Sequence, residues 1–264
     1  MTRINTTFTQ LQHRKALIPY ITAGDPTPAI TVKLMHALRE AGADIIELGM
    51  PFSDPTADGP VIERAHQRAL KQGMSLLKTF ECVRQFREQD QTTPVVLMGY
   101  LNPIEIMGYN PFIHQAKTAG VDGVLVVDLP IEENNDLFIK LKANSIEPIF
   151  LLTPTTSLDR LKRICEQASG FLYYVSLKGV TGAATLDIND VALKLAPVRA
   201  CSKLPIVVGF GIRDAASAAA IVKTADGIVV GSALVAIIEK EYSQPSALIS
   251  KATEFLSDIS KAIR

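Results

Sequence analysis

The sequence has few cysteines and no excess of charge of either sign. Its three cysteines, Cys82, Cys165 and Cys201, are far apart in the chain and form no C-x-x-C pair. A disulfide framework or a zinc ribbon is therefore not expected. Lysine and arginine together number 27, and so do aspartate and glutamate. This balance argues against a protein that binds nucleic acid or an anionic membrane, which normally shows a basic excess.

Long apolar runs are missing as well. The longest, Gly227–Ile238, is interrupted by Gly231 and Ser232 and is shorter than the roughly 20 residues that a membrane-spanning helix needs. Residues 1–7 lack the apolar region of a secretory signal. We therefore expect a cytoplasmic protein that neither spans nor binds a membrane.

What the sequence does contain is a regular alternation of short apolar runs and longer amphipathic segments. Each short run is almost wholly apolar, which is typical of a strand buried on both faces of a parallel sheet. Eight strands are predicted, at residues 16–22, 44–48, 94–98, 123–127, 148–152, 171–176, 205–208 and 227–230.

Eight β/α units in 264 residues favour an α/β fold of the (β/α)8 TIM barrel type. A doubly wound open sheet is the alternative, but no dinucleotide-binding fingerprint follows the first strand. We expect an extra N-terminal helix at Thr2–Leu11 and long loops after strands 2 and 6. No linker divides the chain, so residues 1–264 are predicted to form a single TIM-barrel domain.

In such a barrel, functional residues lie at the carboxyl ends of the strands. Glu47 lies near the end of the second strand and has apolar neighbours, and Asp54 and Asp58 follow in the next loop. Loss of water should raise the pKa of Glu47 towards the range useful for general acid–base catalysis. The alternatives are an internal salt bridge for Glu47 and ordinary turns for the aspartates.

Glycine-rich segments follow three later strands. Residues 177–184, with Lys178, Gly179 and Gly182, suggest a mobile lid or a backbone anion site. Residues 209–211 and the pair Gly231-Ser232 follow strands 7 and 8, where barrels of this class bind phosphate. Each segment also has a purely structural interpretation. Residues 177–184 can be an ordinary flexible connection, and the glycines after strands 7 and 8 can serve only to turn the chain at the corner of the barrel.

Other catalytic signatures are absent from the sequence. There is no Walker A loop, H-E-x-x-H or G-x-S-x-G motif. The four histidines show no metal-ligand spacing, and His36 and His66 fall within helical patterns and are predicted to be structural. No metal is expected.

Taken together, these segments resemble the tryptophan synthase alpha chain family across essentially the whole chain. The most specific motif is ELGMPFSDPTADGP at residues 47–60. It is supported by PYITAGDP at 19–26, SLKGVTG at 176–182, GFGI at 209–212 and Gly231-Ser232.

The resemblance implies a lyase that cleaves indole-3-glycerol phosphate to indole and glyceraldehyde 3-phosphate. It implies that Glu47 is the acid/base residue and that Asp58 binds the indole N–H. It further implies a phosphate site, an indole pocket and a lid residue that reaches Asp58. These are Gly182, Phe210, Gly211, Gly231 and Ser232 for phosphate, Tyr20, Tyr100, Leu125 and Tyr173 for indole, and Thr181 for the lid.

The resemblance also implies a partner, the β subunit, in an α2β2 complex that converts the indole to tryptophan. Asp54 and Pro55 are expected at that interface, and the loop at residues 50–60 and the lid are expected to be ordered by it. No cofactor is expected in this chain, and pyridoxal phosphate belongs to the β subunit. Tyr20, Thr56 and Val127 depart from the residues common in the family. Two other functions stay open, a TIM-barrel aldolase with a Schiff base on Lys178 and a non-catalytic barrel that activates a partner.

Overall fold

The structure is a computed structural model that describes residues 1–133, 135–175, 188–209 and 211–264. Its strands form one parallel sheet in the order β5-β4-β3-β2-β1-β9-β8-β7-β6. The strands are β1 (Ala16–Thr22), β2 (Ile46–Gly49), β3 (Val95–Gly99), β4 (Gly123–Val126), β5 (Glu147–Pro148), β6 (Phe150–Leu152), β7 (Leu172–Val175), β8 (Ile206–Gly209) and β9 (Gly227–Val230).

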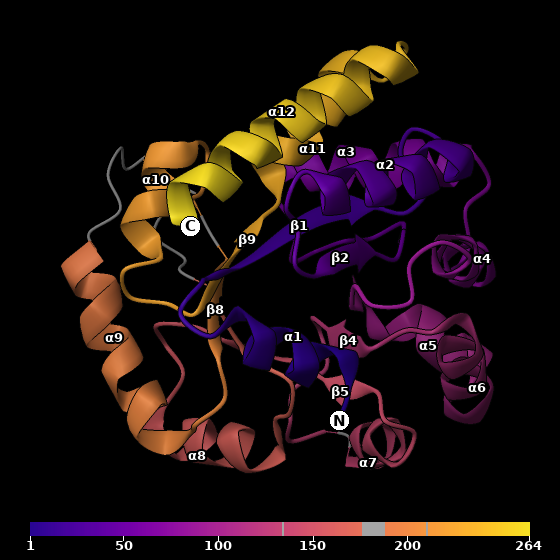
Figure 1. Cartoon of the computed structure of the whole chain (residues 1–264). Coiled ribbons are helices and arrows are strands. Elements are labelled where there is room, and N and C mark those ends of the chain that lie inside the picture. The colour runs from indigo at the N-terminus through magenta and orange to yellow at the C-terminus, as the bar shows by residue number, and fades with distance from the viewer. Residues whose placement is uncertain (134, 176–187, 210) are drawn as a thin grey trace.

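Helices surround this sheet and alternate with its strands along the chain (Figure 1). They are α1 (Arg3–Leu11), α2 (Pro28–Glu40), α3 (Pro60–Lys71), α4 (Leu76–Arg87), α5 (Leu101–Met107), α6 (Tyr109–Ala119), α7 (Asn135–Ala143), α8 (Leu158–Gln167), α9 (Ile188–Cys201), α10 (Ala215–Ile221), α11 (Ser232–Glu241) and α12 (Pro245–Ile263). The predicted TIM barrel is confirmed, with its extra N-terminal helix. The predicted long loop after strand 6 lies outside the described residues.

The strand predicted at residues 148–152 is divided into β5 and β6. β5 pairs with β4, and the Ile149 N–H still donates to the Val124 carbonyl at 2.9 Å. From Phe150 onward the chain pairs with β7 instead, with Phe150 opposite Leu172. The two segments therefore act as one strand that changes its partner, and the nine strands correspond to the eight predicted runs.

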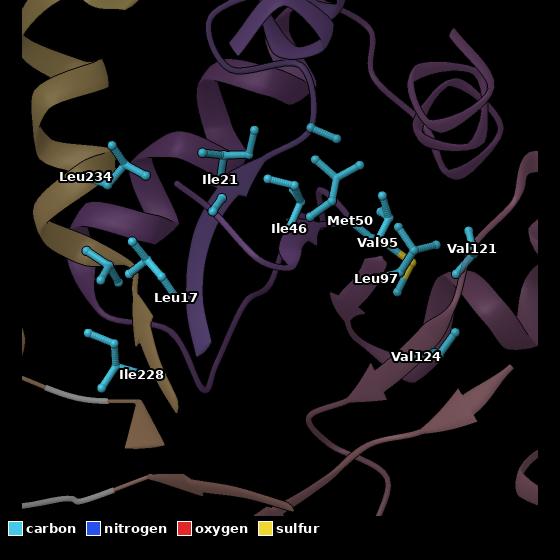
Figure 2. Packing of buried hydrophobic residues seen from close by; sticks show 14 of the residues in the cluster. Leu17, Ile21, Ile46, Met50, Val95, Leu97, Val121, Val124, Ile228 and Leu234 are labelled. Atoms are coloured by element: carbon cyan, nitrogen blue, oxygen red, sulfur yellow. The ribbon is translucent and has the colours of Figure 1, made fainter. Parts of the chain in front are cut away.

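Side chains of the strands alternate between two apolar layers, as the period of a strand requires. In β1, Ile18 and Tyr20 belong to a cluster inside the barrel. Leu17 and Ile21 belong to the larger cluster between the strands and the helices, and Figure 2 shows this layer with Leu234 of α11. Burial on both faces explains why each strand is a continuous apolar run.

Helix α1 covers one end of the barrel and lies in front of the ring of strands in Figure 1. The Thr2 hydroxyl caps the helix by accepting the Asn5 N–H at 3.3 Å. Ile4 is fully buried in the inner cluster with barrel residues such as Ala16 and Phe171. The helix thus covers the end of the barrel at which the strands begin.

A buried ion pair holds this same end together. The Arg87 guanidinium of α4 donates to Asp122, just before β4, at 2.7 Å, and Arg3 of α1 reaches the other oxygen of Asp122 at 2.9 Å. Arg87 also donates to three backbone carbonyls, those of Asp90, Thr93 and Gly120. Removing one partner of such a buried pair is costly, because it leaves the other charge buried and uncompensated.

Within the described part of the chain, no helix combines the length and the apolar character needed to cross a membrane.

Candidate active site

Glu47 lies inside the barrel near the carboxyl end of β2. Its neighbours Ile46 and Leu48 belong to the outer apolar layer, so alternation directs Glu47 inward, between Tyr20 of β1 and Val96 of β3. The residue is 1% exposed, and its Oε2 atom has no hydrogen-bond partner among the described residues. Burial first, and the charge of Asp58 second, raise the pKa of Glu47 to about 8.

Two tyrosines, Tyr20 and Tyr173, lie beside Glu47, and each fits only because a neighbouring residue is glycine and has no side chain. A Cβ atom on Gly49 would lie 2.2 Å from the Tyr20 hydroxyl, and one on Gly209 would lie 2.4 Å from the Tyr173 ring. The Tyr173 hydroxyl hydrogen-bonds to Glu47 and partly offsets the rise in its pKa. Burial raises the pKa of both tyrosines well above the usual value, so they are neutral hydrogen-bonding groups.

Asp58 approaches the same region from the loop between β2 and α3. Its Oδ2 atom accepts the Tyr100 hydroxyl at 2.8 Å, and that hydroxyl oxygen accepts the Ala57 N–H at 3.0 Å. Burial raises the pKa of Asp58, and the Tyr100 hydrogen bond opposes the rise. Tyr100 thus fixes both the loop and one oxygen of the carboxylate.

His66 of α3, predicted from the sequence to be a structural residue, lies beside Asp58. Its ring is buried against Asp58, with 3.6 Å between Nε2 and Oδ2, and its Nδ1 accepts the Phe52 N–H at 2.9 Å. Burial lowers its pKa to about 4. The signal in the sequence was a polar residue on the apolar face of a helix, beside Ala65 and Ala69, directly after the Asp58 loop.

The remaining predicted indole-pocket residue, Leu125 of β4, is buried in the inner cluster with Tyr20 and Tyr173. Val127, which follows β4, packs against that cluster. Three of the four predicted indole-pocket residues, Tyr20, Leu125 and Tyr173, therefore lie in one cluster inside the barrel, and the fourth, Tyr100, hydrogen-bonds to Asp58.

The predicted phosphate residues that the structure describes follow two adjacent strands, β8 and β9. Gly209 of β8 pairs with Val229 of β9. Gly211 comes two residues after Gly209, and Gly231 comes two residues after Val229, so both follow the same level of the sheet. Ser232 begins α11, whose first-turn N–H groups have no partner within the helix. Gly211 has a φ of 68°, a conformation that favours glycine. The predicted residues Gly182, Phe210 and Thr181, together with Lys178, lie outside the described residues.

The loop predicted to face a partner is held by its own turns. The Thr56 N–H donates to the Asp54 carbonyl at 2.9 Å, and the Asp58 N–H donates to the Pro55 carbonyl at 3.0 Å. Asp54 is exposed, but Pro55 is buried.

Met50 and Phe52 of this segment make contacts within the chain. Met50 packs in the outer layer, as Figure 2 shows, and Phe52 stacks on Tyr100 with 5.3 Å between the ring centroids. The apolar composition of the segment therefore reflects packing within the chain.

No group of three or more histidine, cysteine, aspartate or glutamate side chains gathers into a metal-binding arrangement in the ranges that the structure describes. The three cysteines are free thiols. The chemistry that these ranges offer is a proton donor with a raised pKa, a second carboxylate, neutral hydroxyls, and backbone N–H groups at a helix N-terminus. Such a set suits proton transfer on an apolar substrate that carries an anionic group.

Comparison with known proteins gives one consistent result. A family model described as tryptophan synthase alpha chain matches residues 8–264. A tryptophan synthase alpha chain from Thioalkalivibrio sulfidiphilus is 59% identical over 265 residues, covering 100% of both chains. The crystal structure of tryptophan synthase subunit alpha from Legionella pneumophila superposes with a TM-score of 0.94 at 44% identity and covers 100% of this chain and 98% of that one. A tryptophan synthase structure from M. tuberculosis, in an aminoacrylate-bound form, matches with a TM-score of 0.87 at 31% identity, covering 100% of both chains.

Proposed function

The chain belongs to the tryptophan synthase alpha chain family, and from this premise we propose that it cleaves indole-3-glycerol phosphate to indole and glyceraldehyde 3-phosphate. Membership of the family carries an enzymatic role in tryptophan synthesis. The observation that supports this particular reaction best is the buried carboxyl of Glu47 near Asp58, with a pKa of about 8 and an Oε2 atom to which no described residue hydrogen-bonds.

In this proposal Glu47 serves as acid and then as base. Its protonated carboxyl donates the proton to C3 of the indole ring, and the ring becomes indolenine-like with positive charge at nitrogen. The resulting carboxylate then removes the proton from the adjacent hydroxyl of the glycerol chain. The C–C bond breaks, its electrons return to the ring as indole, and the hydroxyl carbon becomes the aldehyde. Glu47 begins and ends protonated, which suits a carboxyl whose pKa is about 8.

Asp58 is proposed to accept the indole N–H while the ring is charged. A carboxylate stabilises developing positive charge where a neutral amide does so poorly. The geometry around Asp58 supports this role because Tyr100 fixes Oδ2 at 2.8 Å, so the carboxylate is oriented before substrate binds. The environments of Glu47 and Asp58 differ, and one carboxyl can therefore hold a proton while the other is ionised.

Gly211, Gly231 and Ser232 are proposed to bind the phosphate, together with Gly182 and Phe210. The first-turn N–H groups of α11, which no side chain of the described residues caps, lie at the carboxyl ends of the strands and support an anion there. Tyr20, Tyr100, Leu125 and Tyr173 would contact the indole ring, and Thr181 would reach Asp58 from the lid. No metal or organic cofactor takes part in these steps, and the cytoplasmic location expected from the sequence stays a prediction.

A β subunit that carries pyridoxal phosphate is the proposed partner, in an α2β2 complex that receives the indole. The exposed backbone turn around Asp54 is the proposed contact. Binding reciprocity gives a test, because a non-cleavable substrate analogue should tighten β-subunit association by the same factor by which the β subunit tightens analogue binding. Equal dissociation constants with and without the analogue would contradict this coupling.

The reaction itself is tested with the purified chain and indole-3-glycerol phosphate. Indole and glyceraldehyde 3-phosphate should appear in equal amounts, and borohydride added during turnover should leave no covalent adduct on the chain. An adduct at Lys178 would instead identify a Schiff-base aldolase. If neither the products nor an adduct appears when the β subunit is present, the chain would instead be a non-catalytic barrel that activates that subunit.

A further inference from the structure

The hydrogen bonds of His66 define which of its nitrogens carries a proton. The Phe52 backbone N–H donates to Nδ1 at 2.9 Å, so this nitrogen presents a lone pair. A neutral imidazole that accepts at Nδ1 must carry its proton at Nε2. Burial lowers the pKa of His66 to about 4, so the ring is neutral at neutral pH. His66 therefore offers one N–H donor, at Nε2.

Two oxygen atoms lie in front of that donor. Asp58 Oδ2 is 3.6 Å from Nε2, and the Tyr20 hydroxyl is 3.4 Å from it. The Tyr20 hydroxyl also lies 3.3 Å from the Thr22 hydroxyl, which gives its own proton an acceptor. Both distances from Nε2 are long for a strong hydrogen bond, as is common at active sites before substrate binds.

We propose that His66 is a positioning residue for Asp58: the Phe52 amide fixes its imidazole as the Nε2–H tautomer, and this N–H holds Oδ2 of Asp58 when substrate binds. The inference rests on the proposed function, since it concerns the carboxylate that would accept the indole N–H. Tyr100 and His66 would then share Oδ2, and Oδ1, to which no described residue donates a hydrogen bond, is left for the substrate.

Several other titratable groups surround Asp58. They are Tyr20 of β1, Glu47 of β2, Tyr100 directly after β3 and Tyr173 of β7. Among them only Glu47 changes its charge in the neutral range, while the tyrosine pKa values are raised. A donor that hydrogen-bonds to ionised Asp58 lowers the pKa of that residue, so loss of the donor should raise it.

Two substitutions distinguish the contact of Nδ1 with the Phe52 N–H from the contact of Nε2 with Asp58. His66→Asn keeps an acceptor near the position of Nδ1 but has no donor at the position of Nε2. His66→Gln extends an amide nitrogen towards the position of Nε2 but loses the acceptor for the Phe52 N–H. If the contact with Asp58 is what matters, His66→Asn should lose about ten- to a hundredfold in kcat/KM, the range of a hydrogen bond to a charged group. His66→Gln should recover much of this loss. The opposite order would overturn the proposal in favour of a purely structural role through Phe52.

Binding of two inhibitors gives a readout that a general loss of structure would not imitate. One probe is an indole alkyl phosphate that cannot be cleaved, and the other is its N-methyl derivative, which has no indole N–H. His66→Asn should bind the first probe about tenfold or more weakly than the wild type does. With the N-methyl probe the two proteins should bind equally well. The same loss with both probes would overturn the proposal.

The Tyr20 contact is controlled for in a double variant. In a Tyr20→Phe background, His66→Asn should still weaken binding of the N–H probe, and it should still move the acid limb of the kcat/KM profile to higher pH. If both effects vanish in that background, His66 acts through Tyr20 and not through Asp58. Turnover of the unaltered chain is measured beside these variants. An inactive wild type would contradict the proposed function, whereas an active wild type matched by His66→Asn would contradict only the role of His66.

Discussion

The charge of Asp58 raises the pKa of Glu47, which burial has already raised, to about 8. The pKa of Asp58 is itself raised by burial, but its hydrogen bond from Tyr100 favours the ionised form. With a pKa of about 8, Glu47 is largely protonated at neutral pH. Two neighbouring carboxyls with separated pKa values can serve as a proton donor and a fixed negative charge in one reaction.

The first prediction is a bell-shaped dependence of kcat/KM on pH. Glu47 must be protonated to begin the reaction, so the rate should fall as pH rises through about 8. Asp58 must be ionised, so the rate should also fall on the acid side as its carboxylate takes up a proton. Steady-state rates of indole release across this range provide the measurement, since kcat/KM reports groups of the free enzyme. A rate that keeps rising beyond pH 9 would mean that Glu47 acts in its ionised form.

The second prediction concerns the stability cost of Glu47. Its pKa is about 8 in the folded chain against an ordinary value of 4.5, so the folded state binds a proton that the unfolded state has lost between these two values. The free energy of unfolding should therefore fall as pH rises through this interval, by about 1.4 kcal/mol per pH unit from this group.

The neutral Glu47→Gln variant lacks this dependence. Its stability advantage over the wild type should grow from pH 4.5 to pH 8 and then level off. Urea unfolding of both proteins at pH 5, 6.5 and 8 measures the difference. A difference that does not change with pH would show that Glu47 is ionised in the folded chain throughout.

The third prediction concerns the phosphate glycines. At Gly231 an added Cβ would lie 3.7 Å from Tyr20 and 4.0 Å from Ile62, so Gly231→Ala should fold normally. The methyl group would still lie where phosphate approaches the backbone, and KM should rise about tenfold or more, since each 1.4 kcal/mol of lost binding is a factor of ten. Thermal unfolding of Gly231→Ala checks that the variant folds normally. Inhibition of the variant and the wild type by inorganic phosphate checks that phosphate binding is weakened. Gly211 is a poorer probe because its φ of 68° makes any side chain costly.

The fourth prediction tests the ion pair at the opposite end of the barrel. Arg87→Leu leaves the buried Asp122 without its nearest cation and should cost about 3–5 kcal/mol of unfolding free energy. Arg84→Leu on the same helix is the matched control, because its pair with Glu81 is largely exposed and should contribute at most about 1 kcal/mol. Equal losses in the two variants would contradict the importance of burial.

Much of the fold could be predicted from the sequence because each strand is buried on both faces. β1 and β9 have the predicted bounds, and the other strands differ by one or two residues at their ends. The division of the strand at Ile149 could not be predicted, since it depends on which neighbour accepts each hydrogen bond and leaves no trace in composition.

Only some features of the candidate site could be predicted from the sequence. Apolar neighbours correctly indicated that the pKa of Glu47 is raised. The packing of Met50 in the outer layer and the stacking of Phe52 on Tyr100 could not be read from the sequence, because both depend on contacts between distant segments. The contacts of His66 could not be predicted, because a histidine on a buried helix face looks like part of the core until its two nitrogens are assigned to named atoms.

The central claim, that the carboxyl of Glu47 breaks the C–C bond of indole-3-glycerol phosphate, is tested most directly by one comparison. Indole release is measured for the wild type and for Glu47→Gln, each purified and saturated with the β subunit, and binding of a non-cleavable analogue is measured in parallel. The wild type should release indole, and Glu47→Gln should be slower by about a hundredfold or more with analogue binding largely intact. Turnover by Glu47→Gln near the wild-type rate would remove Glu47 from the mechanism and contradict the account.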